Sequence, residues 1–292
     1  MTKNDHREGL LASLMQASFQ GDSGQGGHLN QAGRLHYLTQ HIDRFWKTTN
    51  LVDPYLRAIN QPKILDIGSF PYYGPLLYHL RWQANVVGVD MPEAGYWAGI
   101  SAHHAPRRLT ITSGQTHLTF LQYLFNIERE RLPFQAEFDA VFFTEILEHL
   151  LLQPHVALEQ IHRCLKPGGL MVLTTPNAHY AMKLLAILRG TNINEPYNLT
   201  IGVYGRHNRE YLLGEVCQLL EAHHFRLLEK KIINFPKPHL PRLARFKYGL
   251  IDALTQLPGL GRFREGLVVI AQKHGPSVAT TPSFLFRTNA DS

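Results

Sequence analysis

Hydrophobic and polar positions follow a strand-like pattern at two places early in the chain. Residues 62–70 and 86–90 are short apolar, β-branched runs, and each ends in an acidic residue or a glycine turn. This pattern is typical of buried parallel strands that lead into a ligand-binding loop. Between them, residues 74–82 are long enough for one crossover helix. The sequence therefore predicts a strand, loop, helix and strand unit with a carboxylate, Asp90, at the end of its second strand.

The loop of this unit has the residue types that a nucleoside ligand requires. Gly68 lacks a side chain, so the backbone can approach a ligand closely. Asp90 can accept hydrogen bonds from both hydroxyls of a ribose. The loop from Gly68 to Tyr73 does not match the G-x-G-x-x-G pattern of dinucleotide-binding folds, and its bulky residues leave little room for a diphosphate. A nucleoside cofactor other than a dinucleotide is therefore expected.

Periodicity predicts the remaining elements of an α/β fold. Apolar runs indicate strands at 109–112, 138–143, 170–174, 226–235 and 266–272. Helical spacing of apolar residues indicates helices at 34–59, 146–152 and 211–224. The segment 236–264 combines basic residues with regularly spaced apolar ones, which favours an amphipathic helix inserted between the last two strands.

Several later motifs follow one another in a fixed order. Leu-Pro-Phe (132–134) is followed by Phe-Asp-Ala-Val-Phe-Phe-Thr-Glu-Ile-Leu-Glu-His-Leu (138–150), Leu-Lys-Pro-Gly-Gly-Leu (165–170), Leu-Thr-Thr-Pro-Asn (173–177) and Arg-His-Asn-Arg-Glu-Tyr (206–211). In this order and spacing, the chain resembles the class I S-adenosylmethionine-dependent methyltransferases over roughly residues 60–275. Within that family it is most similar to the group that methylates small molecules, quinones, lipids and cell-surface glycans.

The resemblance implies a Rossmann-like three-layer α/β sandwich. Its sheet would have seven mostly parallel strands, and the last strands would pair antiparallel. An N-terminal helix at 34–59 would cover the cofactor pocket as a lid, although the same helix could simply pack on the edge of the sheet. The methyltransferase domain is expected over 34–275 with the helical insertion at 236–264, after a flexible segment at 1–33 and before a loose tail at 276–292.

The resemblance also implies S-adenosyl-L-methionine as the cofactor. Asp66 would organise the loop and the methionine amino group, or serve only as a structural carboxylate. Met91 would lie against the adenine ring, and Glu128 or the adjacent backbone would contact the adenine amino group; a core residue and an exposed loop acid are the respective alternatives. Phe70 and Tyr72 replace the small residues common in this loop of the family. The predicted cofactor-binding residues are Asp66, Gly68, Ser69, Phe70, Asp90, Met91, Ile127, Glu128 and Thr144.

A cluster of ionisable residues follows the predicted strand at 138–143. Glu145 lies three residues before Glu148 and four before His149, so on a helix all three would share one side of the first turn. A hydroxyl acceptor must lose its proton, and an imidazole with an unperturbed pKa of about 6.5 suits that task. His149 and Glu145 are therefore the predicted catalytic residues, with His149 as general base; a structural histidine near the helix end is the alternative.

Polar residues in two later loops are candidates for binding the acceptor. Asn177 opens a loop that commonly borders the acceptor pocket in this family. The polar run from His207 to Tyr211 precedes a helix, so it would either contact the acceptor or form a hydrogen-bond network at the helix start. The predicted substrate-binding residues are Asn177, His207, Arg209 and Tyr211.

Composition narrows the class of protein. The 292 residues, of which 44% are hydrophobic, suffice for one sizeable core. No apolar run reaches the roughly eighteen residues of a transmembrane helix, and the N-terminal residues lack the apolar core of a signal peptide. The two cysteines, Cys164 and Cys217, predict neither a disulfide framework nor a metal site, and a reducing cytoplasm is the expected location.

The net charge of +6 is concentrated in the C-terminal part of the chain. Its basic residues alternate with apolar ones in 236–264, which suits an amphipathic helix at a membrane surface better than a surface that follows phosphates. A lipid-linked acceptor and peripheral membrane contact would explain this segment; a helix that covers the sheet or a homodimer contact is the alternative. No DNA partner is expected.

These observations lead to three hypotheses. The first is an S-adenosylmethionine-dependent methyltransferase that acts on a small-molecule, glycan or lipid-linked acceptor, more readily at oxygen than at carbon or nitrogen. The second is an RNA-binding or RNA-modifying protein of the same fold, although the Asn-Pro-Pro-Tyr and cysteine signatures of such proteins do not occur in the sequence. The third is a catalytically silent relative, supported by the unusual loop at 70–73.

Overall fold

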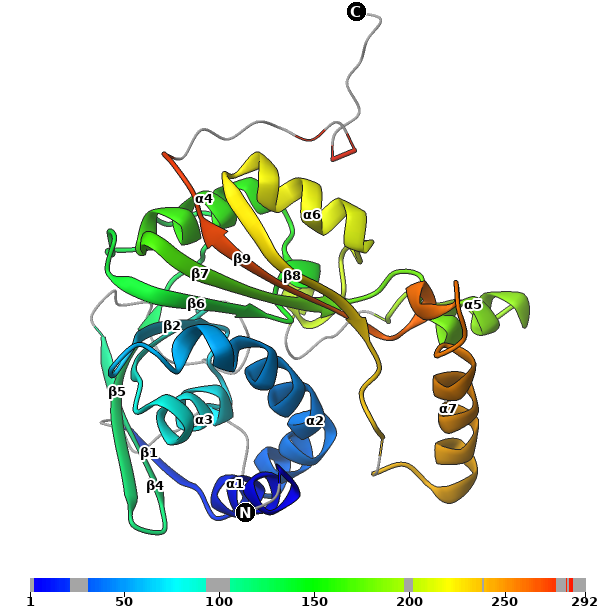
Figure 1. Ribbon diagram of the computed structural model, residues 1–292, viewed down its shortest axis with the longest axis horizontal. Coiled ribbons are helices and arrows are strands. Elements are labelled where there is room, and N and C mark those ends of the chain that lie inside the picture. Colours follow the sequence, from blue (N-terminus) through cyan, green and yellow to red (C-terminus); the bar gives the residue numbers. More distant parts are fainter. Residues whose placement is uncertain are drawn as a thin grey trace, which may run out of the picture.

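One mixed sheet forms the centre of the protein. The computed structural model describes residues 3–21, 31–92, 106–196, 202–237, 239–276, 282 and 284–285. Within them the strands follow the order β1-β4-β5-β3-β2-β6-β7-β9-β8 (Figure 1). The strands are β1 (Ser18–Gly21), β2 (Lys63–Ile67), β3 (Asn85–Asp90), β4 (Arg107–Ser113), β5 (Thr116–Leu124), β6 (Phe138–Thr144), β7 (Leu165–Pro176), β8 (Phe225–Ile233) and β9 (Gly266–Lys273).

Helices cover both faces of this sheet. They are α1 (Lys3–Met15), α2 (Gln31–Leu56), α3 (Tyr73–Trp82), α4 (Pro154–Cys164), α5 (Ala181–Leu188), α6 (Leu213–Ala222) and α7 (Arg242–Leu254). Buried side chains of α1, α2 and α3, among them Leu38 and Leu77, pack against one face of the sheet. Side chains of α4 and α6, among them Ile161 and Leu219, pack against the other face. The expected three-layer α/β sandwich is therefore present (Figure 1).

In the described ranges the sheet has nine strands, where the sequence predicted seven. β5, β3, β2, β6 and β7 are parallel, and β9 and β8 continue the sheet in antiparallel pairing, as expected. The run 109–112, predicted as the third core strand, lies instead in β4, which pairs antiparallel with β5. A tight turn between Ser113 and Thr116 joins the two strands, and Gly114 adopts the positive φ of 57° that such hairpin turns require. β1 and β5 are thus the two strands that the sequence did not predict, and β5 takes the position beside β3.

Part of the segment that was predicted to be flexible, 1–33, is folded. α1 and β1 both lie in it, and β1 pairs antiparallel with β4. Leu14 is fully buried in the core that α1 shares with α2 and α3, and Leu10 and Leu11 pack against the same core. Their helical spacing is the physical reason why this segment folds. Residues 22–30 and most of the predicted tail lie outside the described residues.

The segment after β6 differs from the predicted helix at 146–152. A single turn of 3-10 helix covers Leu147–His149. Glu145 has a φ of 57°, in the left-handed region, so a right-handed helix cannot begin there. Pro154 then starts α4. Glu145 and His149 therefore do not share a helical face, and their relative positions depend on this turn.

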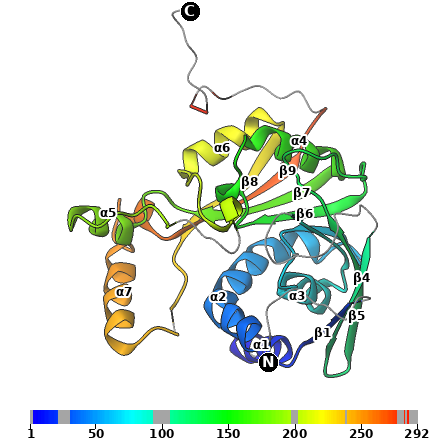
Figure 2. The ribbon, with the colours of Figure 1, turned by 180° about the vertical axis from the view of Figure 1, so that it is seen from behind.

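The predicted helical insertion is present between β8 and β9. Its helix, α7, lies beside α5 at the end of the molecule opposite the β4–β5 hairpin (Figure 1), and the view from behind shows the same arrangement (Figure 2). Neither α5 nor α7 contains a buried residue. Among the described residues, no helix has the length and apolar character needed to span a membrane.

Candidate functional site

The loop after β2 is shaped by a close contact with another loop. Gly68 has a φ of 79°, and a Cβ atom at this position would lie 2.3 Å from Cδ1 of Ile146. Glycine is favoured here because its φ lies in the left-handed region, and the side chain of Ile146 covers the loop in addition, a contact that the sequence did not reveal. The N–H of Gly68 also donates to the carbonyl of Val89 at 2.8 Å, which ties the loop to β3.

The bulky residues of this loop pack into the protein. Tyr72 is 1% exposed, and its ring packs edge-on against the rings of Phe70 and Phe120. Its hydroxyl accepts a hydrogen bond from Gln122. The guanidinium of Arg34, in α2, lies over the rings of Phe70 and Tyr72, 5.4 and 5.5 Å from their centroids. Phe70 and Tyr72, which stand where the family commonly has small residues, therefore anchor the loop between α2 and β5.

Asp90 ends β3 directly beside this loop. Its Oδ1 accepts a hydrogen bond from the N–H of Phe70 at 3.1 Å. Its Oδ2 accepts hydrogen bonds from the hydroxyl of Ser69 and the amide of Gln122, both at 2.5 Å. Because a carboxylate oxygen accepts about two hydrogen bonds, Oδ1 keeps one acceptor position. One acceptor position of Asp90 is therefore left for a ribose hydroxyl, and binding of both hydroxyls stays a prediction.

Asp66 is a second buried carboxylate, on the neighbouring strand β2. Its Oδ1 accepts a hydrogen bond from the hydroxyl of Tyr78 at 3.3 Å. Burial raises the pKa of both Asp66 and Asp90, and the charge of Asp90 raises that of Asp66 further. Neither carboxylate has an ion-pair partner in the described part of the chain. A cationic ligand beside Asp66 would therefore be favourable.

Arg44 of α2 is a residue of the site that the sequence analysis missed. It is 7% exposed, and its guanidinium forms an ion pair of 3.0 Å with Glu145. The other carboxylate oxygen of Glu145 accepts a hydrogen bond of 2.7 Å from Thr174. Arg44, Thr144 and Thr174 line a small pocket between α2 and the sheet. A basic residue among the apolar positions of a predicted helix is the signal that could have revealed Arg44.

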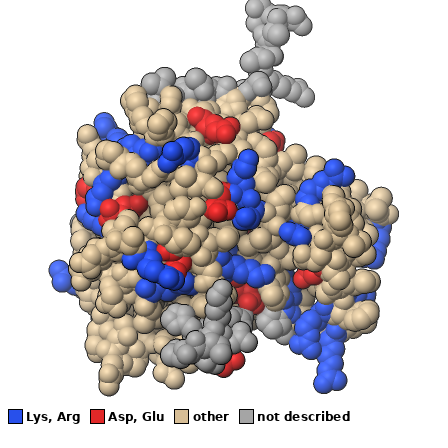
Figure 3. Space-filling model, in the orientation of Figure 1, with Lys and Arg blue, Asp and Glu red and all other residues tan. Residues whose placement is uncertain are grey.

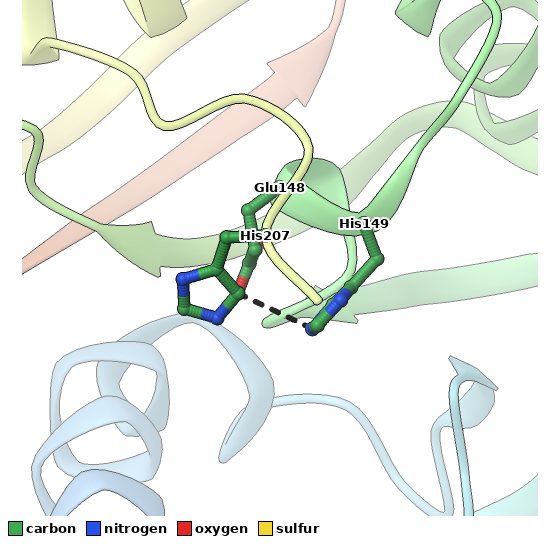
Figure 4. Close-up of side chains that lie close together, drawn as sticks. All are labelled: Glu148, His149 and His207. Carbon is green, nitrogen blue, oxygen red and sulfur yellow. Dashed lines mark ion pairs between the residues drawn. The ribbon is translucent and has the colours of Figure 1, made fainter. Parts of the chain in front are cut away.

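Three side chains converge after the end of β6. Ligand atoms of Glu148, His149 and His207 all lie within 4.8 Å of one another (Figure 4). Glu148 is fully buried, and its Oε2 accepts a hydrogen bond of 2.8 Å from Thr175. Its Oε1 has no hydrogen-bond partner among the described residues and lies 4.0 Å from Nε2 of His149. The cluster therefore offers two imidazoles and one incompletely bonded carboxylate at a single point.

The charge states in this cluster follow from burial and neighbours. Nδ1 of His149 lies 3.0 Å from the carbonyl oxygen of Arg206, to which it donates, so Nε2 carries the lone pair. Burial, together with the nearby His207, lowers the pKa of His149, so the ring is neutral at pH 7. Burial, reinforced by a neighbouring carboxylate, raises the pKa of Glu148 to about 8. Burial alone would lower the pKa of His207, but its hydrogen bond with Glu210 and the charges of the surrounding glutamates together outweigh burial and raise this pKa.

Several residues predicted to bind the cofactor are used by the fold. The carboxylate of Glu128 accepts hydrogen bonds from the N–H groups of Leu151 and Leu152 at 3.0 and 2.7 Å, which fixes the segment after the 3-10 helix. Ile127 is 3% exposed and belongs to the core. Met91 is half-buried just after the end of β3. Two other predicted residues lie at the site: Ser69 donates a hydrogen bond to Asp90, and Thr144 lines the pocket beside Arg44.

Within the described residues, His207 alone of the four predicted substrate-binding residues reaches the cluster. Asn177 is 1% exposed, and its amide donates to two backbone carbonyls of the segment before β9, at 2.8 and 2.7 Å. Tyr211 is 2% exposed in the core. Arg209 forms an ion pair of 3.0 Å with a glutamate of α6. The alternative of a hydrogen-bond network at the helix start therefore describes Arg209 better, whereas Asn177 secures the segment before β9.

Comparisons with known proteins agree on the class. Residues 30–230 match a family model described as "Methyltransferase domain". Over 128 residues, the chain is 32% identical to the ubiquinone biosynthesis O-methyltransferase of Pseudomonas aeruginosa strain UCBPP-PA14, a match that covers 43% of this chain and 49% of that protein. Two further strains contain a protein of the same name that is 31% identical. The chain thus spans about half the length of the curated relatives it matches.

Solved structures share the fold at low sequence identity. A methyltransferase in complex with the Haloferax volcanii Trm112 activator has a TM-score of 0.51 at 15% identity, over 80% of this chain and 92% of that one. The 1,6-didemethyltoxoflavin-N1-methyltransferase of Burkholderia thailandensis, with bound S-adenosylhomocysteine, has a TM-score of 0.50 at 18% identity, over 94% of this chain and 92% of that one.

Fold and site together define an α/β protein that binds a nucleoside ligand where parallel strands end. Because the family model matches more than half of its length, the chain belongs to the class I S-adenosylmethionine-dependent methyltransferase family. The cofactor of this family fits the residues present. It carries an ammonium group, which Asp66 would pair with, and a ribose, for which Oδ1 of Asp90 keeps an acceptor position.

Proposed function

We propose that this protein transfers the methyl group of S-adenosylmethionine to an oxygen atom of a small or lipid-linked acceptor. The observation that carries the proposal is His149, a neutral imidazole whose Nε2 is available as a base just beyond the end of β6. β6 pairs directly with β2, the strand that contains Asp66. The curated relatives are O-methyltransferases by name, which supports oxygen as the methylated atom.

The residues of the chain would position and deprotonate the acceptor. The bound cofactor supplies a methyl group on a positively charged sulfur, which keeps the electron pair of the broken carbon–sulfur bond. The acceptor oxygen forms the new bond to the methyl carbon, and its proton passes to Nε2 of His149. The ion pair between Arg44 and Glu145 holds the turn after β6. A displacement of this kind depends strongly on such positioning.

The surface of α7 supports an acceptor presented by a membrane. Its apolar residues repeat at intervals of three and four, so they share one face of the helix. That face is turned outward, with Leu243 69%, Phe246 71%, Leu250 54% and Leu254 44% exposed. Arg242 and Lys247 are also exposed on this helix. An outward apolar face with basic neighbours is the pattern of a helix that lies in a membrane interface.

α5 extends the same surface. Ile187 and Leu188 are 51% and 82% exposed. Tyr180, at the start of α5, is close enough to Tyr248 and Asp252 of α7 for their charges to act on it. In the space-filling view, Lys and Arg side chains gather around α7 (Figure 3). We define the α5–α7 surface by the exposed apolar residues of both helices and propose that it binds an anionic membrane, from which a lipid-linked acceptor reaches the site.

The double variant Phe246→Ser, Leu250→Ser should bind vesicles of phosphatidylcholine and phosphatidylglycerol at least tenfold more weakly than the wild type. Each apolar side chain buried in the interface contributes about 1.5–3 kcal/mol. Co-sedimentation with vesicles measures the effect. Leu152→Ser is the matched control, because Leu152 is 58% exposed but lies outside the α5–α7 surface. Unchanged vesicle binding would overturn the membrane proposal, and a dimer that dissociates in the double variant would identify the surface as a subunit contact.

Calorimetric titration tests the proposed activity. The purified protein should bind S-adenosylmethionine and S-adenosylhomocysteine saturably, and it should not bind NAD. With a labelled methyl donor, hydroxylated amphiphiles should then be methylated in preference to the corresponding amines. Binding of neither sulfur compound would contradict the proposed function, and methylation of amines alone would contradict oxygen as the acceptor atom.

A further inference from the structure

Two imidazole rings in the cluster after β6 are oriented in the way that metal ligands are. Nδ1 of His149 donates to the carbonyl of Arg206 at 3.0 Å. Nδ1 of His207 lies 2.9 Å from a carboxylate oxygen of Glu210 and 3.3 Å from one of Glu195. Histidines that bind metals almost always donate their other N–H group to a carbonyl or a carboxylate in this manner. Both Nε2 atoms are therefore left to act as ligands.

Glu148 supplies a third ligand atom. Its side chain has no exposed surface, and in the part of the chain that the structure describes Oε1 has no hydrogen-bond partner, although Oε2 is bonded to Thr175. Burying a carboxyl oxygen without a partner is costly, and buried oxygens of this kind call for a specific explanation. A bound cation would remove that cost. Oε1 lies 4.0 Å from Nε2 of His149, so the two atoms are close enough to bind the same cation after small side-chain rotations.

Backbone contacts hold the two ligand-bearing segments together. The N–H of Asn208 donates to the carbonyl of Glu148 at 2.7 Å. The side-chain amide of Asn208 donates to the carbonyl of His149 at 2.9 Å. The loop that carries His207 is thus fixed against the 3-10 turn that carries the other two residues. The three side chains face one another as a consequence of the fold and need no large movement to share a ligand (Figure 4).

From this arrangement we propose that Glu148, His149 and His207 bind one divalent transition-metal ion. Two imidazoles and one carboxylate form a donor set that suits Fe²⁺, Mn²⁺, Co²⁺ or Zn²⁺. Atoms that share such an ion lie about 3–4 Å apart, so ligand atoms now within 4.8 Å need side-chain rotations to close on it. Three protein ligands leave at least one coordination position open. The sequence predicted no metal site because that prediction considered the cysteines, which take no part here.

The role of the ion rests on the proposed methyl transfer. An acceptor hydroxyl bound at the open position would have its pKa lowered by the ion, as metal-bound water does. Its proton would pass to solvent, and its oxygen would form the bond to the methyl carbon. His149 uses the same Nε2 lone pair for the ion or for a proton, so the two roles exclude each other. In the metal-bound protein the ion would therefore activate the acceptor, and the imidazole acts as the base only in the metal-free protein.

Titration of chelator-treated, full-length protein with Mn²⁺ tests the site without reference to activity. The electron paramagnetic resonance signal of free Mn²⁺ should report one saturable site per chain. His207→Ala and Glu148→Gln should each weaken this site at least tenfold, as even the loss of a supporting residue does in metal sites. His79→Ala is the matched control, because Nδ1 of His79 also bonds to a backbone carbonyl, at 3.2 Å, but on α3. Zn²⁺ should displace the bound Mn²⁺.

The outcomes separate the metal site from the activity. Absence of a saturable site, or equal Mn²⁺ affinity in the wild type and His207→Ala, would overturn the inference. If Glu148→Gln fails to fold, His207→Ala still provides the test, because His207 is only half-buried. Calorimetry with S-adenosylmethionine on the same chelator-treated protein checks the proposed function separately. A cofactor-binding protein without the metal site would refute the metal inference alone, whereas metal binding without cofactor binding would refute the proposed function.

Discussion

Asp90→Ala is expected to weaken S-adenosylmethionine binding by roughly 10- to 150-fold. This corresponds to the loss of one charge-assisted hydrogen bond, worth about 1.5–3 kcal/mol. The same substitution removes the acceptor for the N–H of Phe70, the hydroxyl of Ser69 and the amide of Gln122. The loop after β2 should therefore lose its anchor to β3, and the free energy of unfolding should fall as well. Calorimetry gives the affinity, and urea denaturation gives the stability.

Asp139→Ala is the matched control for this prediction. Asp139 also holds a backbone N–H, that of Lys63, at 2.8 Å, and it pairs with Lys166 at 2.7 Å. It lies near the amino end of β6, whereas Asp90 lies at the carboxyl end of β3, so the two residues are at opposite ends of the parallel strands. Its removal should lower stability and leave cofactor affinity unchanged in the folded protein. A folded Asp90→Ala variant with wild-type affinity would show that the ribose is bound elsewhere.

His149→Ala should lower turnover by about a hundredfold or more, as the loss of a general base does. Cofactor affinity should be preserved, because the contacts of Asp66 and Asp90 do not involve His149. Single-turnover methyl transfer under saturating cofactor measures the chemical step. His79→Ala removes a comparable imidazole and should keep the wild-type rate. Full activity of His149→Ala would make this histidine structural, the alternative that the sequence also allowed.

The base and metal-ligand roles of His149 can be distinguished with the same assay. If the imidazole accepts the proton directly, chelator treatment leaves the wild-type rate unchanged. If the ion activates the acceptor, chelation lowers the rate and Mn²⁺ or Zn²⁺ restores it. In the second case, Glu148→Gln and His207→Ala should reduce turnover together with His149→Ala, because each removes one ligand of the same ion.

Local patterns predicted the parts of the fold that depend on neighbouring residues. The β2, α3 and β3 unit was correct because apolar runs, a helix of suitable length and a terminal carboxylate all lie within thirty residues of sequence. The hairpin of β4 and β5 was misassigned because either strand could have filled the third core position on apolar pattern alone. The turn at Gly114, and the pairing of β5 with β3, decided between them.

The site was predictable only in part, because it joins distant segments. The polar run around His207 was recognised as a candidate, but its residues could not be ranked. His207 joins the cluster because its neighbour Arg206 accepts a hydrogen bond from His149, which lies 57 positions earlier in the sequence. Arg209 instead pairs with α6, and Asn177 secures the segment before β9. Tertiary packing determines which of these polar residues reach the cluster, and the local sequence pattern does not indicate it.

The insertion that carries α7 is closed at its base. Ile233 and Gly266 face each other in the β8–β9 ladder. Beyond them, the N–H of Glu265 donates to the side chain of Asn234 at 2.9 Å, and the N–H of Phe235 donates to the carboxylate of Glu265 at 3.3 Å. The end of the insertion that precedes β9 is also tied to the loop after β7, because the amide of Asn177 donates to the carbonyls of Arg262 and Arg264. Because both ends of the insertion are held in this way, replacing α7 alone by a short turn should leave the β8–β9 ladder intact, and would remove the proposed membrane contact while keeping the cofactor site.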